Sequence, residues 1–328
     1  IMSGDLPAGV ATRLFEVLNR PVEIDGRAVP CHCSIGAAST DAETRTPEAL
    51  LRNADLALYA AKRSGRGQVT VYEPGMREAM TAQAAADQRL REAIAEDRFA
   101  PWYQPVLDVR RGRFVGAEVL ARWHDRDGTV IGPASFIASL EQLGLLDAMM
   151  EGLLRRALRE TMPLVANGKL ERLSINVSPT QFNGGWAEVR LPALLDEIGF
   201  PLHALVLEVT ETALVNDLPA TRRTMLALAA RGIRIAVDDF GVGYSNFSIL
   251  RHLPFHFLKL DRSLNADIHT DETALAVAEC IIELATRLRI AVVAEGVETE
   301  AQAELLRAAG CAGLQGFHLA RPQRHLRG

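Results

Sequence analysis

The chain has 328 residues, 48% hydrophobic and 23% charged, and its 36 Lys and Arg against 41 Asp and Glu leave a net charge of −5. This composition is typical of one or two globular domains and excludes disordered, collagen-like and coiled-coil chains. Because the net charge is negative and no long basic run occurs, we expect no binding to duplex nucleic acid.

Residues 1–75 show the pattern of a small α/β segment. Apolar periodicity predicts a helix around Ala11–Leu18, and two short strand-like runs follow, joined by a turn at Asp25-Gly26. Thr46-Pro47 supplies the N-cap and the first residue of a second helix, which Gly65 ends. The order helix, two strands, helix predicts a small α/β piece before the rest of the chain.

Residues 76–97 are a predicted linker, and residues 98–328 are a predicted barrel. The linker is rich in Ala, Gln, Arg and Glu and has few large apolar residues, which predicts a largely solvated helix. Beyond it, short apolar runs alternate with helical segments. The runs are Phe114–Val119, Leu173–Val177, Leu205–Val209, Ile233–Val237, Phe257–Leu260 and Ile290–Ala294, and the helical segments are Pro133–Glu160, Ala220–Arg231, Glu272–Arg289 and Thr299–Ala309. Strands buried on both faces and separated by helices predict a parallel sheet, and about 230 residues of this pattern favour a closed, TIM-like (β/α)8 barrel over an open sheet.

The number of cysteines and the hydropathy of the sequence indicate the cellular compartment of the protein. Four cysteines are too few for a disulfide framework, and none has the spacing of a paired zinc site. No apolar run reaches the ~18 residues of a membrane helix, and the start Met2–Asp5 lacks the layout of a signal peptide. We therefore expect a cytoplasmic location with no membrane contact from this chain. Ile1 precedes Met2, which indicates either a piece of a longer protein or a residue left from cloning, and any sensor or membrane anchor would lie upstream.

Polar residues stand at the ends of the strand-like runs, where a β/α barrel gathers them at one mouth. They are Glu118, Asn176, Glu208, Asp238, Asp239, Lys259, Asp261, Glu295, Glu298 and Gln315. Glu208 and Asn176 interrupt apolar runs, where an unpartnered polar group costs about 1 to 3 kcal/mol. The adjacent Asp238 and Asp239 repel each other unless a cation relieves them. Oxygen ligands of this kind suit Mg²⁺ or Mn²⁺ better than zinc, so the sequence predicts a divalent-metal site.

These residues stand in motifs that resemble those of the EAL-domain cyclic di-GMP phosphodiesterases, in the same order and over about Asp97–Pro322. The naming motif, Glu-Ala-Leu in the family, stands here as Glu118-Val119-Leu120. Further matching motifs are Tyr103-Gln104-Pro105, Ser174–Ser178, Leu207–Glu211, Val237–Gly241, Leu258–Asp261, Ala294–Glu298 and Gln315-Gly316-Phe317. The first 75 residues resemble the C-terminal half of a GGDEF (diguanylate cyclase) domain without its signature motif, so we expect no cyclase activity from them.

The resemblance implies two divalent ions, Mg²⁺ or Mn²⁺. One ion would be bound by Glu118, Asn176, Glu208 and Asp238, and the second by Asp238, Asp239 and Glu295. Two such ions can share a hydroxide and stabilise the attacking and leaving oxygens of a phosphoryl displacement.

The resemblance also implies roles around the metal site. Lys259 would orient water or offset phosphate charge, and nearby carboxylates would keep it protonated. The other residues with implied roles are Glu298 and Gln315, which would position Lys259 or its water, Glu211, which would hold the loop after Ile233–Val237, and Gln104, Arg122 and Asp261, which would contact the substrate. A salt bridge at the barrel rim is the alternative for Arg122, and an ordinary acid at a helix start is the alternative for Glu211.

Two positions depart from the family pattern. Val242 stands where the loop after Asp239 usually has Thr or Ala, which bears on the ordering of that loop and on the rate. Phe317 replaces the more usual Tyr and loses a phenolic hydrogen bond, but it keeps an aromatic face. Neither position is an implied metal ligand.

The leading hypothesis is hydrolysis of cyclic di-GMP to linear pGpG, which ends a bacterial second-messenger signal. The alternatives are a non-catalytic cyclic di-GMP receptor and an unrelated metal-dependent barrel hydrolase. Members of this family commonly pair through a barrel helix and a loop, so the resemblance also implies a homodimer.

Overall fold

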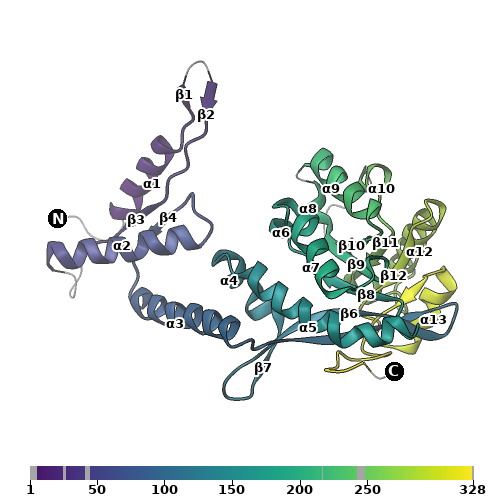
Figure 1. Ribbon diagram of the computed structural model, residues 1–328. Helices are drawn as coiled ribbons and strands as arrows, with labels where there is room; N and C mark the ends of the chain where they lie inside the picture. The colour runs from purple at the N-terminus through teal and green to yellow at the C-terminus, as the bar shows by residue number, and fades with distance from the viewer. Residues whose placement is uncertain (1–5, 25–26, 41–44, 216, 242–247, 327–328) are drawn as a thin grey trace. The chain divides into compact units, whose positions relative to one another are not determined.

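The computed structural model describes residues 6–24, 27–40, 45–215, 217–241 and 248–326 (Figure 1). The chain forms two units, Ile1–Arg89 and Leu90–Gly328. They divide inside helix α3 (Met76–Ala95), within the stretch that the sequence predicts as a linker. None of the helices in the described ranges is long and apolar enough to cross a bilayer.

The first unit contains the small α/β segment that the sequence predicts. Its elements are α1 (Leu6–Leu18), β1 (Val22–Ile24), β2 (Arg27–Val29), β3 (Ile35–Ala37), α2 (Pro47–Arg63), β4 (Val69–Val71) and the first turns of α3. Strands β1 and β2 are antiparallel on either side of the predicted turn at Asp25-Gly26, which itself lies outside the described residues, and β3 pairs with β4 in parallel. Thr46 caps α2 as predicted, because its hydroxyl accepts a hydrogen bond from the Ala49 N–H. Gly36 lets β3 approach α2 closely, since a Cβ there would clash with the Ala54 carbonyl.

The second unit is a closed barrel. Its strands are β5 (Phe99–Asp108), β6 (Arg113–His124), β7 (Val130–Ile131), β8 (Arg172–Asn176), β9 (Leu205–Thr210), β10 (Arg234–Phe240), β11 (Phe257–Leu260), β12 (Ala291–Ala294) and β13 (Gly313–Leu314). In the described chain, eight of these close the barrel in the order β5, β6, β8, β9, β10, β11, β12, β13, and β7 extends the edge of β6. The TIM-like barrel predicted from the sequence is thereby confirmed.

Strand β5 is the exception to the predicted parallel sheet. It is antiparallel to both of its neighbours, β6 and β13, whereas β6 and β8 to β13 run parallel to one another in the barrel wall. Only four residues separate β5 from β6, and Gly112 among them has a φ of +63°. A connection this short can only return the chain in an antiparallel hairpin, whereas a parallel crossover needs a dozen residues or more.

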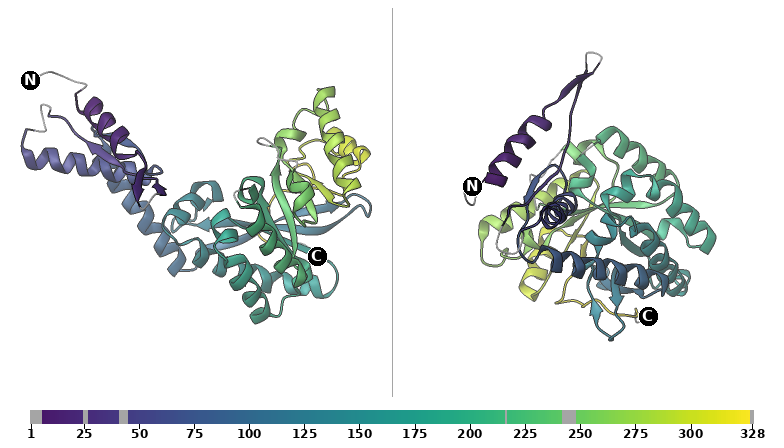
Figure 2. Two further views of the ribbon diagram at one scale, coloured as in Figure 1. Left: turned by 90° about the horizontal axis from the view of Figure 1, so that it is seen from above. Right: turned by 90° about the vertical axis from the view of Figure 1, so that its left-hand side faces the viewer.

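Helices cover the outside of the barrel (Figures 1 and 2). They are η1 (Pro133–Ser135), α4 (Ile137–Gln142), α5 (Leu146–Ala166), α6 (Pro179–Asn183), η2 (Trp186–Arg190), α7 (Leu191–Ile198), η3 (Leu202–Ala204), α8 (Glu211–Val215), α9 (Leu218–Ala230), α10 (Ser248–His252), α11 (Arg262–Asn265), α12 (Glu272–Arg287) and α13 (Glu300–Ala309). The single helix predicted over Pro133–Glu160 is wrong, since the segment holds η1, α4 and most of α5. Gly144, at a φ of +65°, ends α4 in a left-handed conformation that a helix cannot continue.

The barrel wall separates two groups of buried residues, one between the strands and the surrounding helices and one inside the barrel. On β9, Leu205 and Leu207 point outward into the main core between strands and helices. Val206 points inward and packs with Ala236 and Phe257 in a small, separate cluster. Because side chains alternate across a strand, the next inward position after Val206 is Glu208. The barrel interior therefore changes from apolar to charged toward the carboxyl ends of the strands.

Candidate functional site

Strand register brings the predicted polar residues to one end of the barrel. Glu118 of β6 stands opposite Gln104 of β5, and Asn176 of β8 stands opposite Glu208 of β9. Asn176 and Glu208 lie toward the carboxyl ends of their parallel strands, where TIM-like barrels carry their active sites. The arrangement follows from the alternation of each strand, which turns every second side chain into the barrel.

Lys259 is the centre of this end of the barrel. Its side chain is 3% exposed, and its Nζ lies 2.5 Å from Glu295, 2.6 Å from Glu208, 3.1 Å from Asp238 and 3.7 Å from Glu118. Four carboxylates from four different strands or strand ends thus surround one ammonium group. In a buried site, each of these charges needs the others for compensation.

Burial and the charges of neighbouring groups shift the pKa values of the cluster. Burial alone would lower the pKa of Lys259, but the surrounding carboxylates outweigh it and raise that pKa well above its ordinary value. This direction agrees with the protonated lysine expected from the sequence. Burial raises the pKa of Glu208 well above the ordinary value for Glu, and it raises the pKa of Glu295 to about 8. Lys259 lowers both pKa values, whereas the neighbouring carboxylates raise them further.

Amide side chains hold the Glu118 carboxylate in place. Asn176 Nδ2 donates to Glu118 Oε1 at 2.6 Å, and Gln315 Nε2 donates to Glu118 Oε2 at 2.6 Å. Gln315 Nε2 also lies 3.3 Å from Gln104 Oε1. The carboxylate is therefore fixed at both oxygens before any ligand arrives.

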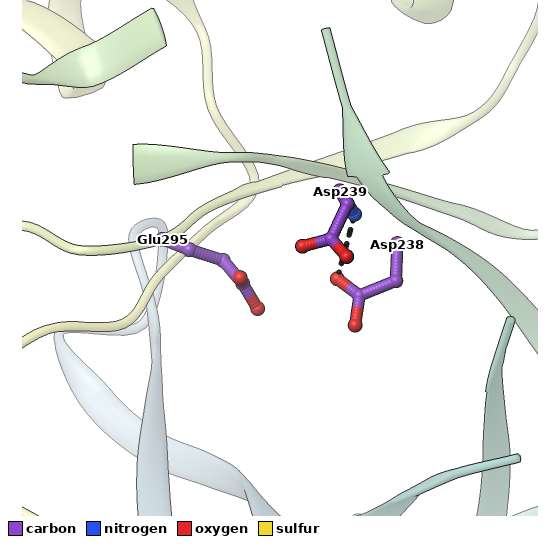
Figure 3. Close-up of side chains that lie close together, drawn as sticks. All are labelled: Asp238, Asp239 and Glu295. Carbon is purple, nitrogen blue, oxygen red and sulfur yellow. Dashed lines mark hydrogen bonds between the residues drawn. The ribbon is translucent and has the colours of Figure 1, made fainter. Parts of the chain in front are cut away.

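Asp238, Asp239 and Glu295 form a second arrangement, with one carboxylate oxygen from each residue within 4.8 Å of the others (Figure 3). The Asp239 N–H donates to Asp238 Oδ1 at 3.0 Å, and Asp239 has a φ of +53°. This left-handed conformation turns two consecutive carboxylates toward the same region. Burial, and then the charge of Asp238, raise the pKa of Asp239. These are hard oxygen donors, and they fit Mg²⁺ or Mn²⁺.

The residues predicted to support Lys259 or the substrate lie around this cluster and make other contacts. Glu298 pairs with Arg262 at 3.1 Å, and Gln315 contacts Glu118 and Gln104. Asp261 caps α11, because its Oδ1 accepts from the Ser263 N–H at 2.8 Å.

Four further positions from the sequence lie outside the Lys259 cluster or outside the described residues. The Arg122 guanidinium lies 5.6 Å from the centre of the Trp102 ring and donates to the Ala121 carbonyl. Glu211 is the first residue of α8. Val242 lies outside the described residues, while Phe317 is 49% exposed with the Arg321 guanidinium 4.5 Å from its ring centre.

A buried pair of amides, missed as site residues in the sequence, holds the segments that carry Glu295 and Asp261. Gln302 Oε1 accepts from the Glu298 and Thr299 N–H groups, and its Nε2 donates to the carbonyls of Asn265 and Ala266. Asn265 Nδ2 donates in turn to the Leu260 and Glu295 carbonyls. The capping-box spacing of Thr299 and Gln302 was a visible signal for part of this network, but no local pattern marks Asn265.

Gln302→Leu is expected to lower the free energy of unfolding of the barrel unit by about 1 to 3 kcal/mol, because it leaves buried backbone groups without partners. Urea unfolding followed by tryptophan fluorescence measures this, since all three tryptophans lie in the second unit. Glu304→Leu, on the exposed side of the same helix, is the control. Equal stability of the two variants would contradict the supporting role of Gln302.

Comparison with known proteins agrees with this architecture. The model of the EAL domain matches residues 87–322, and the model of the diguanylate cyclase GGDEF domain matches residues 5–68. An uncharacterized signaling protein of Caulobacter vibrioides is 38% identical over 98% of this chain and 40% of its own length. The cyclic di-GMP phosphodiesterase NbdA of Pseudomonas aeruginosa is 34% identical over 95% of this chain and 40% of its own length.

A solved structure of the PaMucR phosphodiesterase in complex with c-di-GMP has a TM-score of 0.68 and 34% identity, covering 72% of this chain and 96% of that one. The chain spans about 40% of the length of the two curated relatives above. Over residues 87–322, which make up most of its length, the chain belongs to the EAL domain family.

Proposed function

We propose that this chain hydrolyses cyclic di-GMP to linear pGpG at the carboxyl end of its barrel. The observation that carries the proposal is the Lys259 cluster, in which four carboxylates surround one ammonium group and Asp239 lies beside two of them, in a member of the EAL domain family. The relatives named above as a cyclic di-GMP phosphodiesterase and as a phosphodiesterase in complex with c-di-GMP support the substrate.

The donor set fits two divalent cations. With every acid ionised, Glu118, Glu208, Asp238, Asp239 and Glu295 together with the Lys259 ammonium carry a formal charge of −4, which two such ions would balance. Burial raises the pKa values of Glu208, Asp239 and Glu295, and neighbouring carboxylates raise them further, so added positive charge would favour their ionised forms. We propose Glu118, Asn176, Glu208 and Asp238 as one ligand set, and Asp238, Asp239 and Glu295 as the other.

When bound, the two ions would lower the pKa of water and neutralise charge on the phosphate. The chain's own residues would do the rest. Asn176 and Gln315 hold Glu118 by hydrogen bonds, and the protonated Lys259 supplies a fixed positive charge beside the reacting phosphate. In the hydrolysis, a bond from phosphorus to a water oxygen forms, the bond to a ribose oxygen breaks, and that oxygen takes a proton.

The remaining sequence assignments are proposals for the same reaction. Gln104, Arg122 and Asp261 would contact the substrate, and Arg122 is suited to phosphate because a guanidinium can meet it with two hydrogen bonds. Glu298 would position Lys259 or its water, and Glu211 would hold the loop that follows β10. The cytoplasmic location stays a prediction from the sequence.

The activity test uses the purified chain with cyclic di-GMP and Mn²⁺, with products separated by liquid chromatography. We expect linear pGpG in the presence of Mn²⁺ or Mg²⁺ and none with excess EDTA. Binding is measured in parallel by calorimetry with and without metal. Tight binding without product in either condition would replace the hydrolase with a non-catalytic receptor, and hydrolysis of other phosphodiesters at equal rates would indicate an unrelated barrel hydrolase.

We propose that the barrel pairs as a homodimer through α12. This helix presents an apolar stripe to solvent, with Val277 44% and Leu284 36% exposed and Cys280 exposed between them, and the C-cap Leu288, 45% exposed, continues the stripe. Sedimentation velocity is expected to show a dimer that Leu284→Glu converts to a monomer, because a buried unpaired charge is costly. Leu51→Glu, exposed in the first unit, is the control. A monomer in the parent chain would refute the pairing.

A further inference from the structure

A cavity of about 240 Å³ lies inside the barrel beneath the Lys259 cluster. Its inner end is lined by Glu208, Lys259 and Gln315, which belong to the charged end of the barrel. Its outer end is lined by Arg172 and Phe257, the first residues of β8 and β11. The cavity therefore occupies the half of the interior nearer the amino ends of the parallel strands, opposite the mouth of the proposed active site.

Small side chains leave this space open. Gly116, Ser174, Ala236 and Gly313 line the cavity at inward positions of four strands. TIM-like barrels fill such layers with bulky branched residues, which leave no comparable void. Most of the remaining wall is apolar, with Val206 and Phe257 packed together as part of the small interior cluster. The cavity is thus shaped for an apolar body rather than for a column of water.

A positive charge stands at the outer end of the cavity. The Arg172 side chain is 25% exposed, its guanidinium lies over the Phe257 ring at 5.1 Å from the ring centre, and its closest carboxylate, Asp108, is 4.0 Å away. Within the described ranges, the guanidinium has no hydrogen-bond acceptor. Asp108 and Arg110 both line the cavity, and Arg234 adds positive charge beside Arg172, so the guanidinium groups outnumber the carboxylate at this end.

The carboxylate nearest in sequence does not neutralise this end. Glu171 is engaged by Arg111 and Arg113, at 2.6 and 2.7 Å. Burial, and then the charge of Arg234, lower the pKa of Arg172, as expected for a cation that lacks a close anionic partner. The outer end of the cavity is therefore electropositive, although the chain as a whole carries a net charge of −5.

We propose that this cavity is a second ligand site, which meets the proposed active site only at Glu208, Lys259 and Gln315, and that it binds a small aromatic carboxylate with its ring inside the barrel and its carboxylate on Arg172. An apolar cavity of about 150 Å³ is enough to bind benzene, so the larger volume here has room for a ring and a carboxylate. A guanidinium binds a carboxylate through two parallel hydrogen bonds, which Arg172 has free donors to make. The ring would lie against Phe257 and Val206.

Benzoate is the probe, and binding to the full chain is measured by calorimetry and by ligand-observed NMR in excess EDTA, which keeps metal binding out of the measurement. We expect a dissociation constant of about 1 mM or tighter, in keeping with a ligand of this size. Toluene, which has the ring but no charge, and acetate, which has the charge but no ring, are each expected to bind at least about tenfold more weakly.

Two variants change different features of the site. Arg172→Gln removes the charge, and Ala291→Leu fills the outer part of the cavity, which Ala291 lines. Each is expected to weaken benzoate binding by at least about tenfold, whereas Arg113→Gln, on the same face but outside the cavity lining, leaves it unchanged. Circular dichroism confirms that each variant is folded. Absence of benzoate binding, or binding that neither Arg172→Gln nor Ala291→Leu weakens, would overturn the proposal. Because the test measures binding without metal, its outcome is independent of the proposed hydrolysis.

Discussion

Asp238→Asn is expected to reduce cyclic di-GMP hydrolysis by about 1000-fold or more, a loss of about 4 kcal/mol of transition-state stabilisation. Asp238 belongs to both proposed ligand sets. Its carboxylate lies 3.1 Å from Lys259, and one of its oxygens lies within 4.8 Å of carboxylate oxygens of Asp239 and Glu295. Asparagine keeps the shape of the side chain but removes the charge that both ions would share. The loss is measured as kcat/KM with saturating Mn²⁺, and metal affinity is measured separately by calorimetry.

The same substitution should not damage the fold. Asp238 is repelled by Asp239 and by the carboxylates around Lys259, so a neutral side chain there relieves like-charge repulsion. We therefore expect the metal-free variant to unfold at the same temperature as the parent or higher. Asp196→Asn, at a surface ion pair with Arg231, is the matched control and should keep full activity. Activity within tenfold of the parent in Asp238→Asn would remove the basis for the two-ion proposal.

Lys259→Met is expected to lower the free energy of unfolding of the metal-free barrel by about 3 to 5 kcal/mol, the usual cost of removing one partner from a buried ion pair. Four carboxylates would lose the only ammonium group that the described residues place among them. Methionine fills a similar volume, so the loss reflects charge more than packing. Urea unfolding in EDTA, followed by tryptophan fluorescence, measures the effect.

Divalent metal is the internal check on this second prediction. Mn²⁺ at 100 times its dissociation constant adds about 2.7 kcal/mol to the stability of any protein that binds it only when folded. We expect Mn²⁺ to restore part of the stability of Lys259→Met but not its hydrolytic activity, because the fixed charge beside the phosphate is still missing. Lys169→Met, an exposed lysine of the same unit, is the control. A Lys259→Met variant as stable as its control in EDTA would show that the ammonium does not compensate the cluster.

Local patterns in the sequence were sufficient for the parts of the fold that depend on neighbouring residues. The cap at Thr46, the end of α13 at Gly310, and the strand at Phe257–Leu260 all follow from side-chain chemistry within a few positions. Glu208 was recognisable as a site residue because a carboxylate inside an apolar run is costly without a partner. The break at Gly144 escaped the same reasoning, because a glycine within a helical pattern is compatible with either outcome.

Long-range pairing decided the rest. The pairing of β5 with β13, the contact of Glu298 with Arg262 and the support of Glu295 by Asn265 each join residues or strands that become neighbours only when the barrel closes.

The sequence by itself determined which polar residues stand at strand ends and in which order, since that depends on local alternation and on motifs. Only the tertiary structure decided that four carboxylates share Lys259 and that a cavity lies beneath it. Those features depend on register between strands and on the volume left by side chains from opposite walls, and neither quantity is encoded in any single segment.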